Sequence, residues 1–455
     1  MFFEKIRSEG LSQLSYILGD EGRAAVIDPR RDCDIYRQIA DREGCRITHI
    51  FETHRNEDFV VGSCELMEQT GAEVYHGAAL PFKYGNPVTE GERFNFGNFS
   101  VQILKTPGHT DESISLVLSD MEFSEQPLAI FTGDALFIGD VGRTDFYPER
   151  AKEVAGLLYD SIFDKILPLG DHVLLYPAHG AGSVCGSGMA SREFSSLGYE
   201  RCFNPALQVK DRSEFIHNKI SEIHYYPPYF REMEKLNLAG PHLLGKLPWP
   251  KPFSADEFAA AMAEGMLALD IRSPEAISGA SITDSLAIPL EMLTAYVGWF
   301  VPHEQKIGLI VQNFADIKPA LRSLVRIGYE NLVAYLDEGL HGWEISGRRY
   351  ERIPSLFAGD LKQWQEDGKE FTLLDVRKQD EVERGQLTGS THIYLGELPK
   401  KIDEIPPERP IVTFCGSGMR AIIASSLLKR RGFEQVETCL GSMKACQAVG
   451  CPIKS

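Results

Sequence analysis

The chain has 455 residues, of which 43% are hydrophobic and 25% charged, the balance of a soluble globular protein with several domains. Its formal net charge is −18, which disfavours nucleic acid or an anionic membrane surface as a partner. No apolar run approaches the roughly 18 residues of a membrane-spanning helix. Nine cysteines without a paired framework indicate reduced thiols, and the charged N-terminus lacks a secretory core, so we expect a cytoplasmic protein.

The first part of the chain alternates short apolar strands with turns and helices. Strands are predicted over 14–18 and 24–28, followed by a helix over 35–43 and a strand over 47–51. Histidines or aspartates then follow apolar stretches at four places, in the segments 53–59, 106–110, 131–135 and 176–180. Metal ligands from distant parts of a chain converge in this way when strands end at one edge of a sheet.

A segment rich in proline and glycine over 240–252 is predicted to be a linker. After it, Ser254 and Glu257 have the spacing of a helical capping box. The stretch 266–272 is an apolar strand that ends in Asp-x-Arg, and the stretch 372–377 repeats that pattern. Two α/β repeats of about 100 residues each are therefore predicted, each with a parallel sheet.

Near the C-terminus, an apolar strand from Ile411 leads into a tight loop that begins at Cys415, and a helix follows. Gly416 and Gly418 let the backbone curl closely around the thiol, and Arg420 adds a positive charge. Backbone N–H groups in such a curl favour an anion, so we expect a reactive, exposed thiolate with a lowered pKa. The alternative is a buried structural cysteine.

The loop Cys415-Gly416-Ser417-Gly418-Met419-Arg420 resembles the active loop of the rhodanese sulfurtransferases. The resemblance extends from about residue 354 to the C-terminus, although Gln386 replaces a usual histidine. It implies a five-stranded parallel sheet and sulfur transfer through a persulfide on Cys415, with the six loop residues as the catalytic set. We place Asp375 and Arg377, at the strand end upstream, among the substrate-binding residues.

The preceding repeat is rhodanese-like but lacks the reactive groups. Aligning the two repeats sets Val311 opposite Cys415 and Asp316 opposite Arg420. We therefore predict an inactive module over 250–352. It serves either as a spacer or as an interface, for example between the two copies of a homodimer. The active module is predicted over 353–455.

The N-terminal segments, taken together and in order, resemble the metallo-β-lactamase superfamily over about residues 1–240. This implies an αββα sandwich, with a domain predicted over 1–242, in front of the two rhodanese-like parallel α/β domains. The family motif T-H-x-H-x-D-H here has Asn56 and Phe59 at two of its histidine positions. The loss of the last histidine removes a ligand of the second metal and disfavours a dinuclear hydrolase.

The segment 142–146, together with 179–186 and 199–207, resembles persulfide dioxygenases, including those fused to rhodaneses. That branch holds one Fe(II) on two histidines and one carboxylate, with positions left open for O₂ and substrate. It implies glutathione as the thiol carrier, with coenzyme A or other small thiols as substitutes.

The positions that match the iron ligands are Asn56, His109 and Asp134, and an amide oxygen is a poorer ligand than imidazole. Three alternatives remain. His54 supplies the second imidazole beside His109 and Asp134; or Asp58, Asp134 and His179 hold a metal at the neighbouring position; or no metal binds and the domain only binds ligand. Fe(II) is the expected metal, with Zn as the lesser alternative.

Two further residues each have two possible roles. Arg143 either pairs with a substrate carboxylate or holds its own loop through Asp145, and Cys185 either relays sulfur or is a small buried residue.

The most economical interpretation is a fused sulfur-processing enzyme. Cys415 takes sulfur from a donor such as thiosulfate, and the N-terminal domain binds the resulting small-molecule persulfide or oxidises it to sulfite; the reverse direction makes thiosulfate from sulfite. The alternatives are a sulfurtransferase with a metal-free N-terminal binding module and a Zn-dependent thioester hydrolase. A redox sensor, with Cys439, Cys446 or Cys451 resolving a disulfide to Cys415, is a fourth.

Overall fold

The computed structural model describes residues 1–184, 186 and 188–454. Cys185, for which we weighed a sulfur relay, lies outside the described residues. In the described part of the chain, no helix is both long and apolar enough to cross a bilayer.

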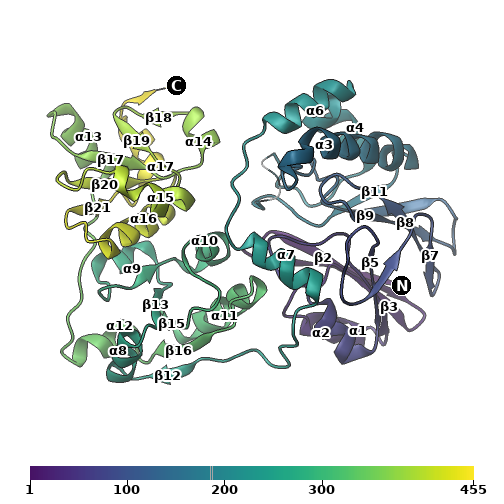
Figure 1. Ribbon diagram of the computed structural model, residues 1–455, viewed down its shortest axis with the longest axis horizontal. Helices are drawn as coiled ribbons and strands as arrows, with labels where there is room; N and C mark the ends of the chain where they lie inside the picture. Colours follow the sequence, from purple (N-terminus) through teal and green to yellow (C-terminus); the bar gives the residue numbers. More distant parts are fainter. Residues whose placement is uncertain (185, 187, 455) are drawn as a thin grey trace. The chain divides into compact units, whose positions relative to one another are not determined.

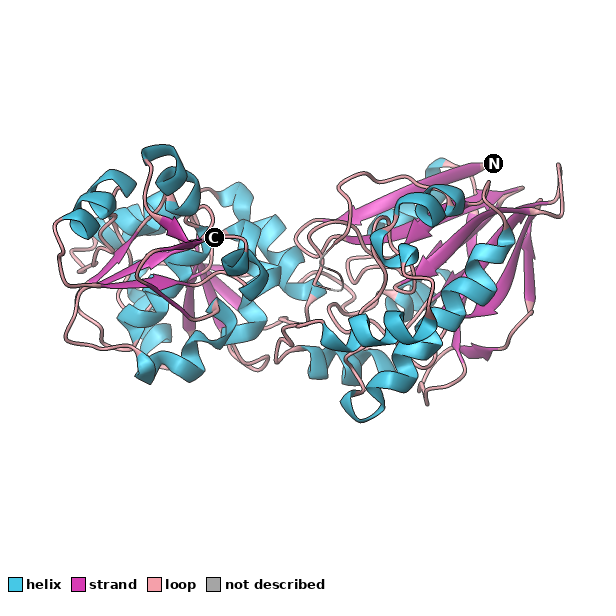
Figure 2. Ribbon diagram, turned by 90° about the horizontal axis from the view of Figure 1, so that it is seen from above, coloured by secondary structure: helices cyan, strands magenta, loops and turns pink. Residues whose placement is uncertain are grey.

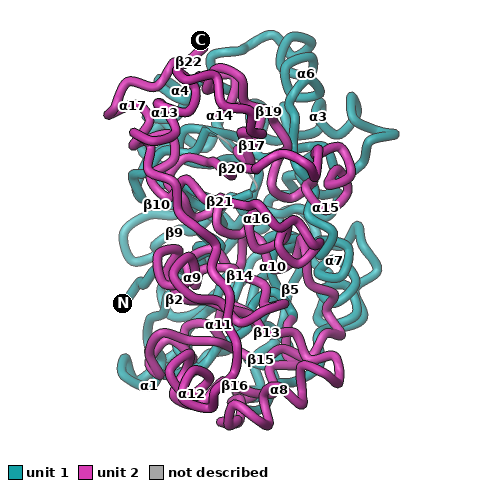
Figure 3. The backbone as a smooth tube through the Cα atoms, turned by 90° about the vertical axis from the view of Figure 1, so that its left-hand side faces the viewer, with its two compact units in different colours: residues 1–246, 325–328 teal, residues 247–324, 329–455 magenta. Residues whose placement is uncertain are grey.

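The chain divides into two compact units, shown in different colours in Figure 3. Unit 1 comprises residues 1–246 and the short segment 325–328, and unit 2 comprises 247–324 and 329–455. Unit 1 therefore continues to Lys246, past the predicted domain end.

Unit 1 contains two β-sheets that pack face to face. The strand order is β1-β2-β3-β4-β5-β6 in the first sheet and β11-β10-β9-β8-β7 in the second. The strands of the first sheet are β1 (Phe2–Ser8), β2 (Gln13–Asp20), β3 (Arg23–Ile27), β4 (Arg46–Phe51), β5 (Glu73–Gly77) and β6 (Asn86–Val88). Those of the second are β7 (Arg93–Phe96), β8 (Phe99–Lys105), β9 (Ile114–Asp120), β10 (Pro127–Gly133) and β11 (Leu174–Pro177).

Helices flank these strands and complete an αββα arrangement (Figures 1 and 2). Helices α1 and α2 share a hydrophobic cluster with the first sheet, and α3 and α6 share one with the second. The α-helices of unit 1 are α1 (Asp34–Arg42), α2 (Ser63–Thr70), α3 (Ala151–Asp160), α4 (Leu197–Phe203), α5 (Pro205–Gln208), α6 (Arg212–Ser221) and α7 (Phe230–Ala239). The predicted sandwich is confirmed.

The β2 strand shows why the sequence forms these layers. Tyr16 and Leu18 face the core between the two sheets, whereas Ile17 faces the cluster beneath α1. Side chains alternate between the faces of a strand, so a strand that is covered on both faces is apolar along its length. The four elements predicted up to residue 51 correspond to β2, β3, α1 and β4, with shifts of a few residues at the ends.

Unit 2 begins with a parallel sheet of strand order β12-β16-β15-β13-β14. Its strands are β12 (Lys251–Phe253), β13 (Leu267–Asp270), β14 (Leu286–Ala287), β15 (Ile307–Ile310) and β16 (Leu332–Leu336). Its helices are α8 (Ala255–Ala263), α9 (Pro274–Gly279), α10 (Leu293–Phe300), α11 (Ile317–Arg326) and α12 (Gly339–Ile345). The capping box of Ser254 and Glu257 is confirmed at the start of α8.

The predicted linker was too long by its last residues, because Lys251 and Pro252 belong to β12. An edge strand tolerates proline, since only one of its sides needs hydrogen bonds to a neighbour.

The C-terminal part of unit 2 has a parallel sheet of strand order β19-β17-β20-β21 and a separate antiparallel pair, β18 and β22. Its strands are β17 (Thr372–Asp375), β18 (Gln386–Leu387), β19 (Ser390–His392), β20 (Ile411–Phe414), β21 (Val436–Thr438) and β22 (Ile453–Lys454). Its helices are α13 (Ala358–Glu366), α14 (Gln379–Glu383), α15 (Leu398–Lys401), α16 (Met419–Arg430) and α17 (Ser442–Val449).

The main sheet therefore has four strands among the described residues, one fewer than the resemblance implied. A single parallel bridge joins Ser355 to Thr438 at its edge, where a fifth strand would lie. The preceding Pro354 has no N–H to donate, which limits pairing there.

Candidate metal centre and sulfur-transfer loop

The candidate metal residues of unit 1 lie in loops that follow strands. His54 comes after β4, His109 after β8, Asp134 directly after β10 and His179 two residues after the end of β11. All four side chains are almost completely buried. The strand ends therefore bring together residues that are far apart in sequence.

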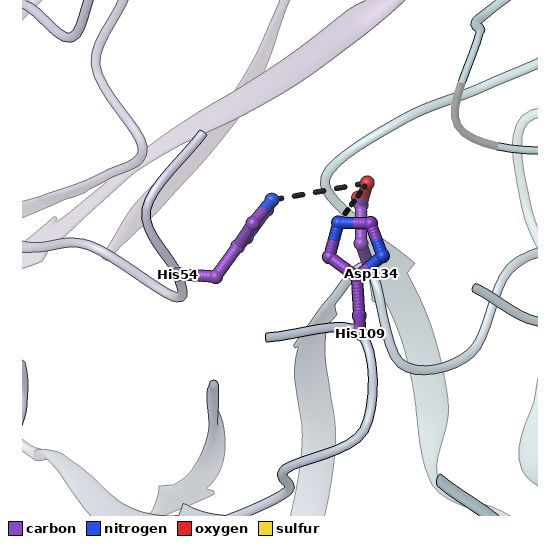
Figure 4. Close-up of side chains that lie close together, drawn as sticks. All are labelled: His54, His109 and Asp134. Carbon is purple, nitrogen blue, oxygen red and sulfur yellow. Dashed lines mark ion pairs between the residues drawn. The ribbon is translucent and has the colours of Figure 1, made fainter. Parts of the chain in front are cut away.

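His54, His109 and Asp134 form one cluster (Figure 4). The Nε2 atoms of His54 and His109 lie 3.8 Å and 3.5 Å from Oδ2 of Asp134. One ligand atom from each residue lies within 4.8 Å of the others. Two imidazoles and a carboxylate at these separations could surround one metal ion, which is the arrangement of the first alternative drawn from the sequence.

The hydrogen bonds of the two histidines direct their Nε2 lone pairs toward this cluster. Nδ1 of His109 lies 3.0 Å from the carbonyl oxygen of Arg143, which can only accept a hydrogen bond. Nδ1 of His54 lies 2.9 Å from Oγ1 of Thr53, whose hydroxyl donates to the Asp28 carboxylate at 2.8 Å. In the neutral rings the proton is therefore assigned to Nδ1, and Nε2 is free to bind a metal.

The cluster leaves buried polar atoms unsatisfied. His54 Nε2, His109 Nε2 and Asp134 Oδ2 have no hydrogen-bond partner within the described part of the chain. A buried polar atom without a partner costs about 1–3 kcal/mol, and a bound cation removes that cost. These residues therefore fit a divalent metal, and two histidines with one carboxylate is a donor set suited to Fe(II).

His179 has a different environment. Its Nδ1 lies 2.7 Å from Asp134 Oδ1, and its Nε2 lies 3.1 Å from Asp58 Oδ2. Burial lowers the pKa of His179, but the two carboxylates outweigh it and hold that pKa well above 6.5. The Phe59 ring beside it offers no donor, and the ligand atoms of Asp58, Asp134 and His179 do not all lie within 4.8 Å of one another. These contacts disfavour the alternative of a metal held by Asp58, Asp134 and His179.

The residues around Asp134 keep that carboxylate ionised. Burial raises its pKa, but the protonated His179, hydrogen-bonded to it, outweighs burial and holds the pKa of Asp134 below its ordinary value. Asn56 donates its Nδ2 hydrogen to the His54 carbonyl oxygen at 3.3 Å, and its Oδ1 has no hydrogen-bond partner among the described residues. The sequence reasoning overlooked Glu57, whose Oε2 lies 3.5 Å from His109 Nε2.

Arg143 is buried and satisfied within the protein. Its Nε and NH2 groups donate to the two carboxylate oxygens of Asp145, each at 2.6 Å, and NH1 donates to the carbonyl oxygens of Val184 and Tyr225. These contacts support the structural role that we weighed for Arg143. A contact with substrate stays a prediction.

The candidate sulfur-transfer loop of unit 2 begins directly after β20, where Cys415 is only 1% exposed. Its Sγ accepts a hydrogen bond from the Gly418 N–H at 3.1 Å, and the Ser442 hydroxyl lies 3.7 Å away. Gly418 has φ 98°, and a Cβ there would lie 2.0 Å from the Leu440 carbonyl oxygen. The curl around the thiol is present, but the thiol is buried rather than exposed as expected, because Sγ points inward to these donors.

Arg420 lies in the first turn of α16, but it is not a free cation. Its NH1 and NH2 groups donate to the two carboxylate oxygens of Glu381 at 2.5 and 2.8 Å. The sequence analysis overlooked Glu381, which reaches the loop from α14. The positive character of the loop therefore depends on backbone N–H groups more than on the arginine.

Asp375 and Arg377 brace the end of β17. Arg377 donates to both Asp375 oxygens and to the carbonyl oxygens of Gly385 and Glu381. Asp270 with Arg272 forms the same brace at the end of β13. The pair occurs in a repeat without a nucleophile, so these contacts support a structural role, and substrate binding by Asp375 and Arg377 stays a prediction.

Helix α10, from the repeat without a nucleophile, packs against the C-terminal module within unit 2. The Trp299 ring lies edge-on to Tyr394, with ring centroids 5.6 Å apart. The same ring lies so close to Gly396 that a Cβ there would come within 2.7 Å of it. Ser426 of α16 also donates its hydroxyl to the Ser285 carbonyl oxygen at 3.2 Å. The first repeat thus supports the module that carries Cys415.

Comparison with known proteins finds a family model for each of the two domains. The model of the metallo-β-lactamase superfamily matches residues 9–179, and that of the rhodanese-like domain matches residues 357–448. Human mitochondrial persulfide dioxygenase ETHE1 is 34% identical over 207 residues, which are 43% of this chain and 71% of that protein. Hydroxyacylglutathione hydrolase GloC of Haemophilus influenzae is 28% identical over 220 residues, covering 43% of this chain and 92% of that protein.

A solved structure extends the similarity into unit 2. A metallo-β-lactamase from Staphylococcus aureus is 32% identical, with a TM-score of 0.66, and the match covers 74% of this chain and 98% of that one. Fold and site together define a metallo-β-lactamase-fold protein joined to a C-terminal rhodanese-like domain. Within that class, the chain belongs to the family of the ETHE1 persulfide dioxygenases.

Proposed function

We propose that this enzyme of sulfur metabolism combines sulfur transfer at Cys415 with oxidation of a small-molecule persulfide at the centre formed by His54, His109 and Asp134. The observation that carries the proposal is the convergence of three buried donor atoms, without hydrogen-bond partners among the described residues, in a chain of the persulfide dioxygenase family. Fe(II) is the proposed metal, and a glutathione-like or coenzyme A-like thiol is the proposed carrier.

In the sulfur-transfer step, the Cys415 thiolate attacks the outer sulfur of thiosulfate. A new S–S bond forms, the S–S bond of thiosulfate breaks, and sulfite leaves with the bonding electron pair. The N–H of Gly418, already bonded to Sγ, is placed to stabilise the anionic persulfide. A thiol R–SH then takes the outer sulfur, which gives R–S–SH and restores the Cys415 thiolate.

In the oxidation step, R–S–SH, O₂ and water give R–SH, sulfite and two protons. Iron bound at the centre would supply the redox chemistry that brings O₂ to react with the terminal sulfur. The Nδ1 atoms of His54 and His109 are hydrogen-bonded to the Thr53 hydroxyl and the Arg143 carbonyl oxygen, respectively. The Nε2 atoms of both rings are therefore free to bind the metal. Asp134 stays ionised and contributes the negative charge.

Apolar rings shape the surroundings of this centre. Phe146 lies edge-on to His109 with ring centroids 5.1 Å apart, and Tyr226 and Phe230 pack behind it. Phe59 stands at the position of a lost histidine ligand and is fully buried. These rings exclude water from one side of the centre and favour a single metal. A hydrolase that uses two metals lacks a ligand here, so the thioester hydrolase remains the second alternative.

Two variants test the combination. With thiosulfate, glutathione and O₂, the wild-type protein should consume O₂ and release sulfite. Cys415→Ser should lose O₂ uptake with thiosulfate and keep it with preformed glutathione persulfide, whereas His109→Ala should keep thiosulfate sulfurtransferase activity and lose O₂ uptake with either substrate. Full sulfurtransferase activity in Cys415→Ser would refute the first step. Wild-type protein that transfers sulfur but neither binds metal nor consumes O₂ would support the sulfurtransferase-only alternative.

A further inference from the structure

Glu57 places a carboxylate beside the metal centre, at a position between two residues of the altered histidine motif. The residue is 1% exposed, and its Oε2 lies 3.5 Å from His109 Nε2. That oxygen has no hydrogen-bond partner among the described residues. Asn56, next to it, stands where the family motif has a histidine, so the chain has lost an imidazole and carries a buried carboxylate one residue away.

The neighbours of Glu57 leave Oε2 available. Arg55 NH2 lies 3.4 Å from the other oxygen, Oε1, and also 3.3 Å from Glu234 Oε1. His109 gives its Nδ1 proton to the Arg143 carbonyl oxygen, so in the neutral ring Nε2 has only a lone pair. A lone pair and a carboxylate oxygen that face each other repel. A cation between them makes the contact favourable, either a proton on Nε2 in the free protein or a metal ion in the loaded protein.

We propose that Glu57 is a further protein ligand of the metal bound by His54, His109 and Asp134, and that it replaces the imidazole lost at position 56. In the described structure Oε2 lies outside the set of ligand atoms within 4.8 Å of one another, so the Glu57 side chain must move toward the ion when the metal binds. Two neutral imidazoles and two carboxylates balance the charge of a divalent ion. The added oxygen donor also makes the ligand set harder, which suits Fe(II) or Mn(II) better than a soft metal. This inference rests on the proposed function only in requiring that the centre binds a divalent metal.

The test compares Glu57→Gln with Glu234→Gln in the full-length protein. Both variants remove a carboxylate that faces Arg55, but only Glu57 also faces His109. The apoprotein is titrated without oxygen with Fe(II), and separately with Co(II), whose visible spectrum reports its ligands. We expect Glu57→Gln to weaken binding of both ions by about 100-fold or more, beyond the usual range for residues around the ligands, and to change the Co(II) bands. Glu234→Gln should bind within about threefold of wild type.

Equal affinity and identical Co(II) bands in wild type and Glu57→Gln would overturn this inference while the proposed metal function stands. Wild-type protein that binds neither ion would overturn both. Should Glu57→Gln fail to fold, a crystal structure of the metal-loaded wild type decides instead. It should place Oε2 of Glu57 about 2.0–2.2 Å from the metal, as for other carboxylate ligands, and a Glu57 that stays outside the coordination sphere refutes the inference.

Discussion

The guanidinium of Arg420 is bound by both oxygens of the Glu381 carboxylate, at 2.5 and 2.8 Å, beside the loop that contains Cys415. The pair fixes the side chain of Arg420 and cancels most of its charge. Burial lowers the pKa of Arg420, but Glu381 outweighs it and the pKa of Arg420 is raised, so this arginine stays charged. An anion at Sγ therefore meets a neutralised pair, not an isolated cation.

This pairing leads to a prediction for Glu381→Gln. The change removes a negative charge near the thiol and leaves Arg420 with its full charge, so alkylation of Cys415 by iodoacetamide at pH 7 should become faster. Two charges about 4 Å apart in water interact by about 1 kcal/mol, so an effect of that order would change the rate roughly threefold to tenfold. Asp380→Asn, an exposed neighbour paired with Arg384, is the matched control and should react like wild type. A slower reaction in Glu381→Gln would show that the orientation of Arg420 matters more than its charge.

Gly418 should tolerate no side chain. Its φ of 98° disfavours an L-residue, and a Cβ there would lie 2.0 Å from the Leu440 carbonyl oxygen. Gly418→Ala should therefore lower the free energy of unfolding by about 2 kcal/mol or more and remove sulfur transfer, because the N–H that reaches Sγ must move. Gly416→Ala is the control, since the nearest atom to a Cβ there is the end of the Arg420 side chain at 3.3 Å. Urea unfolding and cyanolysable sulfur measure both effects; equal stability of the two variants would refute the argument.

The repeat without a nucleophile should support the reaction of its neighbour. Trp299→Ala removes a ring that packs on Gly396 and Tyr394, and we expect it to lower the free energy of unfolding by about 2–3 kcal/mol and to reduce sulfur transfer at Cys415. Phe314→Ala, at a residue 62% exposed in the same repeat, should change neither. If Trp299→Ala has unchanged stability and activity, the first repeat does not support the reaction at Cys415 and is only a spacer.

A half-buried histidine of β4 gives a prediction for the pH dependence of stability. Burial lowers the pKa of His49 from 6.5, so below about pH 6.5 the unfolded chain takes up a proton there that the folded chain does not. This group should therefore lower the free energy of unfolding as pH drops from 7.5 to 5.5, whereas His179, whose pKa is well above 6.5, acts in the opposite direction. Over this pH drop, His49→Phe, which keeps a ring beside Phe51 and Tyr75, should gain stability relative to wild type. Urea unfolding midpoints at pH 5.5 and 7.5 measure this difference in stability. His341→Gln, at an exposed position, is the control and should show the same pH dependence as wild type.

Much of the architecture could be predicted from sequence, because strands buried on both faces read as apolar runs and their ends carry the histidines and aspartates. The turn at Gly418 could also be predicted, since few residues other than glycine fit a curl around a thiol. The Glu381–Arg420 ion pair could not be predicted, because the two residues are far apart in sequence and no local pattern joins them. The burial of Cys415 depends on the same tertiary packing. Glu57 occupies a variable position of its motif, so only the geometry indicated it.

The central claim is that the N-terminal centre is an iron site that oxidises persulfide. The most direct measurement loads the apoprotein with Fe(II) under anaerobic conditions, removes excess metal, and measures iron content and O₂ uptake on glutathione persulfide together. The account predicts close to one iron per chain and uptake of O₂ with release of sulfite. Iron below about a tenth of an equivalent, with no O₂ uptake, would contradict it.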